Sequence, residues 1–143
     1  ATERTLSAFF EELAAAQVAI EGMILKPNMV IPGKKSAGKA YAKEVAQATT
    51  ELFKKVLPAN LPGIVFLSGG QSEVEATENL NAISRAPGNP WPFSFSYGRA
   101  LQASALEAWK GKPENVPAGQ QAFLHRAKMN SLAALGKYEG ENA

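Results

Sequence analysis

Glu21-Gly22-Met23-Ile24-Leu25-Lys26-Pro27-Asn28 is a short apolar run that ends in a lysine followed directly by a proline. Alternation with a period of two places Ile24 and Lys26 on the same face of a strand. Pro27 supplies no backbone donor and biases Lys26 toward an extended conformation. Residues 21–26 are therefore predicted to form a strand that ends at the lysine.

Lys26 lies where barrel enzymes carry their chemistry, at the carboxyl end of a strand. In apolar surroundings the uncharged form of a lysine is favoured, and a free amine attacks carbonyl carbons. The alternative is an edge lysine with its ammonium group in water, which is the commoner situation. This segment alone favours the solvated lysine, and the rest of the chain reverses that preference.

Two further strands are predicted, each separated from the one before it by a helix. Residues 63–68 are a continuous apolar run after Pro62, typical of a strand buried on both faces. Residues 91–97 alternate phenylalanine with serine. Apolar spacing and chain breakers predict helices over 2–19, 40–56, 72–85, 99–109 and 118–135, with a basic, glycine-containing loop at 32–39 and a polar link at 110–117. Strands separated by helices indicate parallel pairing.

Each predicted strand ends in a group suited to carbonyl or phosphate chemistry. Lys26 ends the first strand, Ser68-Gly69-Gly70 the second, and Ser96-Tyr97-Gly98-Arg99 the third. Because the carboxyl ends of parallel strands lie at the same edge of a sheet, the three groups are expected to converge.

The glycine turn and the arginine are both suited to bind an anion. The turn precedes a helix that opens with the capping box Ser72-Glu73-Val74-Glu75, so backbone N–H groups and a helix N-terminus are available. Arg99 offers a planar fork of donors. Taken singly, these features are more often an ordinary turn and a solvated side chain. Together with the lysine, they predict a phosphate site beside a reactive amine.

Composition narrows the class of protein. The 143 residues are 45% hydrophobic, which suits one ordinary domain, and the net charge of +2 argues against nucleic-acid binding. The absence of cysteine excludes disulfides and cysteine metal sites. The apolar runs are far shorter than the roughly 18 residues of a membrane span. The start Ala1-Thr2-Glu3-Arg4 lacks an initiator methionine, so we expect a piece of something longer.

Three long motifs resemble class I fructose-1,6-bisphosphate aldolase. They are residues 21–30 (EGMILKPNMV), 66–73 (FLSGGQSE) and 95–102 (FSYGRALQ), and residues 76–83 and 130–138 are similar as well. The resemblance therefore covers essentially the whole chain. It implies an α/β fold, a partial (β/α)8 TIM barrel of which this chain carries the last three strands and their helices.

The resemblance also implies roles for particular residues. Lys26 matches the lysine that forms a Schiff base with the ketose, and the residues that match bisphosphate-binding positions are Ser68, Gly69 and Gly70 on one loop and Ser96 and Arg99 on the next. The implied reaction is the reversible cleavage of fructose 1,6-bisphosphate in glycolysis and gluconeogenesis, without metal or cofactor. A homotetramer in the cytoplasm is implied for the full-length protein, with a plastid location left open.

The chain departs from the family in several respects. The family's general acid/base glutamate, a second active-site lysine and another acidic residue lie on earlier strands that this chain lacks, and no terminal tyrosine closes it. Glu21 lies at the wrong end of its strand and Tyr138 follows the last helix, so neither takes those roles. His125, the only histidine, is predicted to be structural or solvent-facing.

Two alternatives stay open. One is a non-catalytic sugar-phosphate-binding or assembly module, and the other is a Schiff-base aldolase for another sugar phosphate. As a part of an aldolase, the fragment alone is predicted to have little activity, because the acid/base strands are missing.

Overall fold

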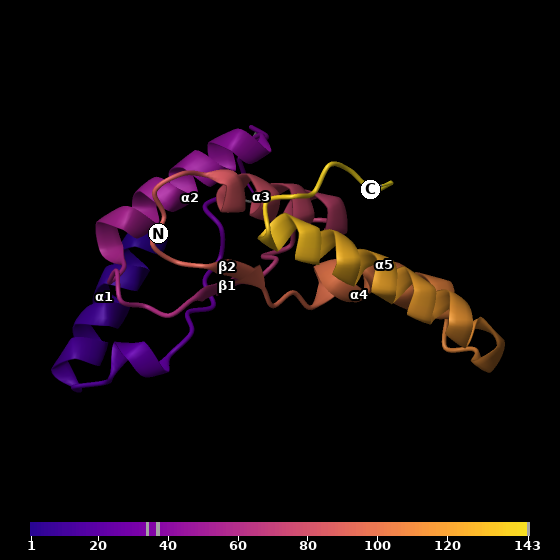
Figure 1. The fold of residues 1–143 in the computed structure, drawn as a ribbon, viewed down its shortest axis with the longest axis horizontal. Coiled ribbons are helices and arrows are strands. Elements are labelled where there is room, and N and C mark those ends of the chain that lie inside the picture. Colours follow the sequence, from indigo (N-terminus) through magenta and orange to yellow (C-terminus); the bar gives the residue numbers. More distant parts are fainter. Residues whose placement is uncertain (34, 37, 143) are drawn as a thin grey trace.

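The computed structural model describes residues 1–33, 35–36 and 38–142. Its helices are α1 (Thr2–Ala15), α2 (Ala42–Val56), α3 (Glu73–Arg85), α4 (Arg99–Trp109) and α5 (Val116–Ala134), its strands are β1 (Ile64–Phe66) and β2 (Phe93–Phe95), and two 3-10 turns span Ile20–Gly22 and Pro113–Asn115. Residues 34 and 37 of the predicted loop at 32–39 lie outside the described residues. Figure 1 shows α2 and α3 on one side of the sheet, with α4 and α5 running together away from it.

The two strands pair in parallel, as predicted. Ile64 is level with Phe93, and Phe66 is level with Phe95. The first predicted strand is reduced to an isolated parallel bridge between Leu25 and Ile64. The prediction of a strand over 21–26 was wrong at its start, because residues 20–22 form a 3-10 turn. This segment has β1 on one side only, and the described chain supplies no strand for its other edge.

Helix boundaries follow the predictions within a residue or two, except at α1. This helix ends at Ala15 instead of residue 19, because Gln17 adopts a left-handed conformation with φ 54°. The N–H of Gln17 donates to the carbonyl of Ala14 (3.0 Å), and the N–H of Val18 donates to that of Leu13 (3.0 Å). These two bonds form a Schellman motif, which satisfies the last carbonyls and stops the helix.

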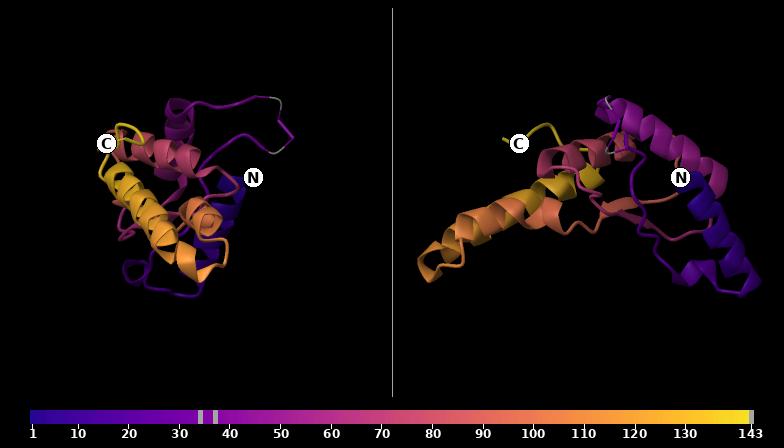
Figure 2. Two further views of the ribbon diagram at one scale, coloured as in Figure 1. Left: turned by 90° about the vertical axis from the view of Figure 1, so that its right-hand side faces the viewer. Right: turned by 180° about the vertical axis from the view of Figure 1, so that it is seen from behind.

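Helix α5 begins at Val116, two residues before the predicted start, with a proline in its first turn. It packs along α4 (Figure 2). A Cβ added at Gly119 would lie 3.0 Å from the Cβ of Trp109, so the glycine permits this close approach. The polar link between the helices includes a 3-10 turn over Pro113–Asn115.

The core lies between the sheet and the helices on one of its faces. The ring of Phe66 is fully buried and stacks 5.9 Å from Phe53 of α2 and 5.7 Å from Phe93. Val65, on the opposite face of β1, is only half-buried. The prediction that this strand is buried on both faces was therefore wrong for the chain by itself, because the helices cover one face and the other stays open.

Candidate active site

The carboxyl ends of the three extended segments meet at one edge of the sheet. The N–H of Leu67 donates to the carbonyl of Pro27 (3.0 Å), and the N–H of Ser96 donates to the carbonyl of Phe66 (2.9 Å). The backbone just after Lys26 therefore lies beside the end of β1, which lies beside the end of β2. The structure confirms that these three strand ends converge.

Lys26 lies on the open face of the sheet. Leu25 pairs in parallel with Ile64, so the next residue, Lys26, lies beside Val65. Leu25 is buried, whereas Lys26 and Ile24 are exposed, as alternation along an extended segment requires. The apolar burial expected for the lysine is absent here, because no described element covers this face.

A glycine turn follows β1 and leads into α3. Gly69 has φ 60° and Gly70 has φ 91°, a left-handed region that side chains with a Cβ rarely adopt. The turn is closed by Gln71, whose backbone N–H (3.0 Å) and side-chain amide (2.9 Å) both donate to the carbonyl of Ser68. Ser68 is buried, whereas both glycines are exposed.

Helix α3 begins with the predicted capping box. The N–H of Glu75 donates to the hydroxyl of Ser72 (3.2 Å), and the N–H of Ser72 donates to the carboxylate of Glu75 (2.8 Å). The hydrogen bond from the Ser72 backbone N–H and, second to it, the Ser72 side chain lower the pKa of the Glu75 carboxyl group. The helix N-terminus is thus fixed directly behind the glycine turn, with its positive dipole end toward the sheet edge.

The loop after β2 alternates exposed and buried side chains. Ser96 and Arg99 are exposed, and Arg99 is the first residue of α4. Tyr97 is buried, and its hydroxyl donates to the carbonyl of Ala76 in α3 (3.0 Å). Desolvation raises the pKa of Tyr97, so the hydroxyl keeps its proton and remains a donor. This bond holds the loop against the helix that follows the glycine turn.

Sequence reasoning missed three residues that organise this edge, namely Gln71, Glu73 and Tyr97. All three lie inside quoted motifs, but nothing local marks their partners. The amide of Gln71 approaches the sulfur of Met29 (3.7 Å), and the carboxylate of Glu73 accepts hydrogen bonds from Ser104. These partners are distant in sequence, so only the fold brings them together.

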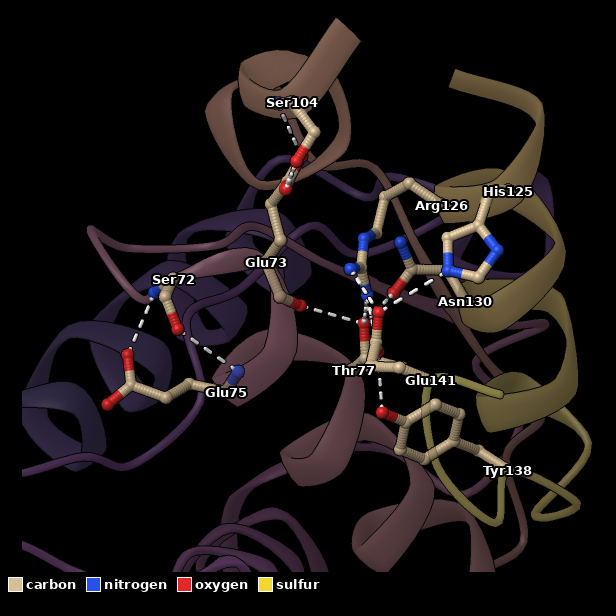
Figure 3. Close-up of polar contacts among 10 residues, drawn as sticks. All are labelled: Ser72, Glu73, Glu75, Thr77, Ser104, His125, Arg126, Asn130, Tyr138 and Glu141. Carbon is tan, nitrogen blue, oxygen red and sulfur yellow. Dashed lines mark hydrogen bonds and ion pairs between the residues drawn. The ribbon is translucent and has the colours of Figure 1, made fainter. Parts of the chain in front are cut away.

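A second polar cluster ties the chain after α5 to α3 and α5 (Figure 3). The nearly buried guanidinium of Arg126 donates to both carboxylate oxygens of Glu141, at 3.0 and 2.6 Å. The hydroxyl of Tyr138 donates a hydrogen bond to the carboxylate of Glu141 (2.6 Å). The Nε2 atom of His125 lies 3.4 Å from the same carboxylate. His125 and Tyr138 thus make structural contacts away from the sheet edge, in agreement with the sequence analysis.

Acid should loosen this cluster. Arg126, first among several contacts, lowers the pKa of Glu141 from 4.5 to about 2. Because the folded-state pKa is depressed, the stabilisation is present above 4.5 and is lost as the pH falls from there toward about 2. Glu141→Gln should remove this acid-dependent component, whereas Glu139→Gln, an exposed carboxylate in the same segment, should not. Hydrogen exchange of residues 138–142 across this pH range measures it. Identical profiles for the two variants would contradict the assignment.

Two features are absent from the described part of the chain. No group of three or more histidine, aspartate or glutamate side chains among these residues is placed to hold a metal ion. None of the helices described here is both long and apolar enough to cross a membrane.

Comparison with known proteins identifies the family. The family model for glycolytic, class I fructose-bisphosphate aldolase matches residues 1–143. The chain belongs to the class I fructose-bisphosphate aldolase family. This assignment agrees with the resemblance that the three sequence motifs carry.

Similar aldolases come from distant organisms. Fructose-bisphosphate aldolase of Echinococcus multilocularis is 55% identical over 98% of this chain, and cytosolic fructose-bisphosphate aldolase 4 of Arabidopsis thaliana is 53% identical over 98%. Chloroplastic aldolase 1 of Pisum sativum is 58% identical over 92%. The chain spans only 36–39% of the length of these relatives.

A solved aldolase structure shares the fold of this chain. It is the fructose-bisphosphate aldolase of Plasmodium falciparum in complex with TRAP and a small-molecule inhibitor, with a TM-score of 0.93 and 48% sequence identity. The similarity covers 97% of this chain and 40% of the Plasmodium chain. The helices and the two-stranded parallel sheet are thus arranged as in part of an aldolase.

Proposed function

We propose that this chain is the carboxyl-terminal part of a fructose-bisphosphate aldolase and supplies the Schiff-base lysine, Lys26, together with the phosphate-binding loops of the active site. The observation that carries the proposal is the meeting of three strand ends at one edge, with Lys26, the glycine turn and Arg99 following one another across it. In barrel enzymes, this edge holds the active site.

The reaction would begin with attack of the Lys26 amine on C2 of fructose 1,6-bisphosphate, and loss of water would give a protonated imine. The C3–C4 bond then breaks, its electron pair moves toward the imine nitrogen to form an enamine, and the C4 hydroxyl loses its proton as glyceraldehyde 3-phosphate leaves. Protonation of the enamine and hydrolysis of the imine release dihydroxyacetone phosphate and restore the lysine. The chemistry needs neither metal nor cofactor.

Ser68, Gly69, Gly70, Ser96 and Arg99 would bind phosphate and so hold the carbonyl near the amine. Adjacent strands lie about 4.8 Å apart, so the two loops are one and two strand spacings from the lysine segment. The exposed glycines let an anion approach the backbone at the N-terminus of α3, and Arg99 adds a charged donor at the start of α4. Binding of this kind converts attack on the carbonyl into an intramolecular step.

The remaining barrel strands would cover the open face and contribute the general acid/base. The relatives' greater length supports this division, since the chain matches 39% of the Echinococcus aldolase. In the complete protein, burial under those strands would supply the apolar surroundings that Lys26 lacks here. We further propose a homotetrameric complete protein. Because similar aldolases are named cytosolic and chloroplastic, we propose a cytoplasmic location and keep a plastid as the alternative.

Borohydride trapping tests the central proposal. The complete polypeptide that carries this chain is mixed with dihydroxyacetone phosphate, reduced, and digested for mass spectrometry. A reduced adduct on Lys26 is expected. Phosphate binding without any adduct would instead establish a non-catalytic sugar-phosphate module, and preference for another sugar phosphate in a substrate panel would establish a different aldolase.

Arg99→Ala should weaken binding of dihydroxyacetone phosphate much more than binding of dihydroxyacetone. A charge-assisted contact to phosphate contributes about 1.5–3 kcal/mol, or roughly tenfold to a hundredfold in affinity. Trapping of the imine as a function of ligand concentration measures both affinities. Arg4→Ala, an exposed arginine on α1, serves as control and should leave both unchanged. Equal losses for the two ligands would show that Arg99 does not bind the phosphate.

A further inference from the structure

We infer that Glu73 is a positioning residue, which fixes the arginine-bearing loop after β2 relative to the glycine turn after β1. The inference rests on the proposed function, since it assigns a role within the phosphate site. Glu73 is the first residue of α3 and follows Gly70 by three positions. Its side chain reaches across to α4, the helix that begins with Arg99.

The contact joins Glu73 to a single residue of α4 through two donors. The backbone N–H of Ser104 donates to one carboxylate oxygen (3.1 Å), and the Ser104 hydroxyl donates to the other. Figure 3 shows this carboxylate directed at Ser104, away from the cluster around Arg126. Both residues are partly buried, so these charge-assisted bonds are sheltered from water. Two bonds to one residue restrain both the distance and the orientation of α4.

A second bond places Tyr97 against the same turn of α3. The hydroxyl of Tyr97 donates to the carbonyl of Ala76. Tyr97 precedes Arg99 by two residues and Ser104 follows it by five, while Glu73 and Ala76 lie within the first four residues of α3. The chain is thus held to α3 on both sides of Arg99, whose own side chain is exposed.

This arrangement fixes the backbone that carries the exposed side chain of Arg99. The glycine turn is attached directly to α3, so a contact that fixes α4 to α3 also fixes Arg99 relative to that turn. If the two loops bind one phosphate, their relative placement sets how many donors reach it at once. A displacement of about 1 Å at such a site can cost a large factor in rate or affinity.

The test uses the complete polypeptide that carries this chain, with inorganic phosphate and dihydroxyacetone as separate probes. Glu73→Ala should weaken phosphate binding about tenfold, because Arg99 is no longer held in place. Imine trapping with unphosphorylated dihydroxyacetone should be unchanged, since Lys26 lies on another segment. Glu73→Gln, which keeps one acceptor oxygen, should lose less.

Matched variants separate positioning from simple loss of stability or charge. Ser104→Ala should reproduce a smaller part of the loss, and the double variant Glu73→Ala/Ser104→Ala should be no worse than Glu73→Ala alone, because the two residues act through one contact. Glu107→Ala removes the same charge from the exposed surface of α4 and should bind phosphate like the wild type. If Glu73→Ala does not fold, Ser104→Ala and Glu73→Gln still decide the outcome.

The possible results differ for the two proposals. Unchanged phosphate affinity in Glu73→Ala and Ser104→Ala, even with a lower melting temperature, would overturn the positioning role and leave the proposed function intact. Additive losses in the double variant would also overturn it. Failure of the wild type to bind phosphate or to form an adduct on Lys26 would refute the proposed function, and the inference with it.

Discussion

Lys26→Met should abolish trapping of dihydroxyacetone phosphate on the complete polypeptide that carries this chain. The thioether has no amine to attack the carbonyl, so no imine forms and the adduct is lost entirely. Phosphate binding should stay nearly intact, because the proposed phosphate contacts lie on the loops after β1 and β2. Borohydride trapping followed by mass spectrometry measures the adduct, and calorimetry with inorganic phosphate measures the binding.

A loss of folding should not account for this result, because methionine is close to lysine in length and suits the apolar surroundings proposed for Lys26 in the complete protein. Lys43→Met, at an exposed lysine of α2, is the matched control and should retain the full adduct. Circular dichroism checks that both variants are folded. An adduct that persists in Lys26→Met would assign the imine to another lysine. Equal loss of adduct and of phosphate binding in a folded variant would also overturn the role.

The chain by itself should be a poor catalyst and should self-associate. The general acid/base is absent from its proposed site, and the loss of such a group typically costs about 10²–10⁴-fold in rate. Within the described residues, no element covers the face of the sheet on which the half-buried Val65 lies. No strand pairs with the free edge of the Leu25 segment either. Exposed apolar strand surface and open edges favour association with other chains.

Light scattering of the purified 143-residue chain, with an assay of fructose 1,6-bisphosphate cleavage, measures both expectations. Addition of the amino-terminal part of a similar aldolase should reduce self-association and raise the rate, since it supplies the missing strands. A monodisperse monomer that cleaves the substrate at an ordinary enzymatic rate would contradict the proposed division of the active site.

Local sequence signals were sufficient for most of the secondary structure. The capping box at Ser72 and Glu75 predicted the start of α3 correctly, because its hydrogen bonds join residues three positions apart. The end of α1 was missed because the left-handed Gln17 carries no glycine-like signal. The strand over 21–26 was overpredicted, since a strand needs neighbours on its edges and the sequence pattern contains no information on whether they are present.

The sequence by itself determined the family, the order of strands and helices, and the residues expected at the three strand ends. Those features depend on residue types at short spacing and on long motifs, and both are present in the sequence itself. Only the tertiary structure decided that Lys26 lies on an open face of the sheet. It also decided that contacts of Tyr97 and Glu73 attach the chain on either side of Arg99 to α3. Burial and long-range hydrogen bonds depend on which segments meet in space, and local residue patterns do not specify those meetings.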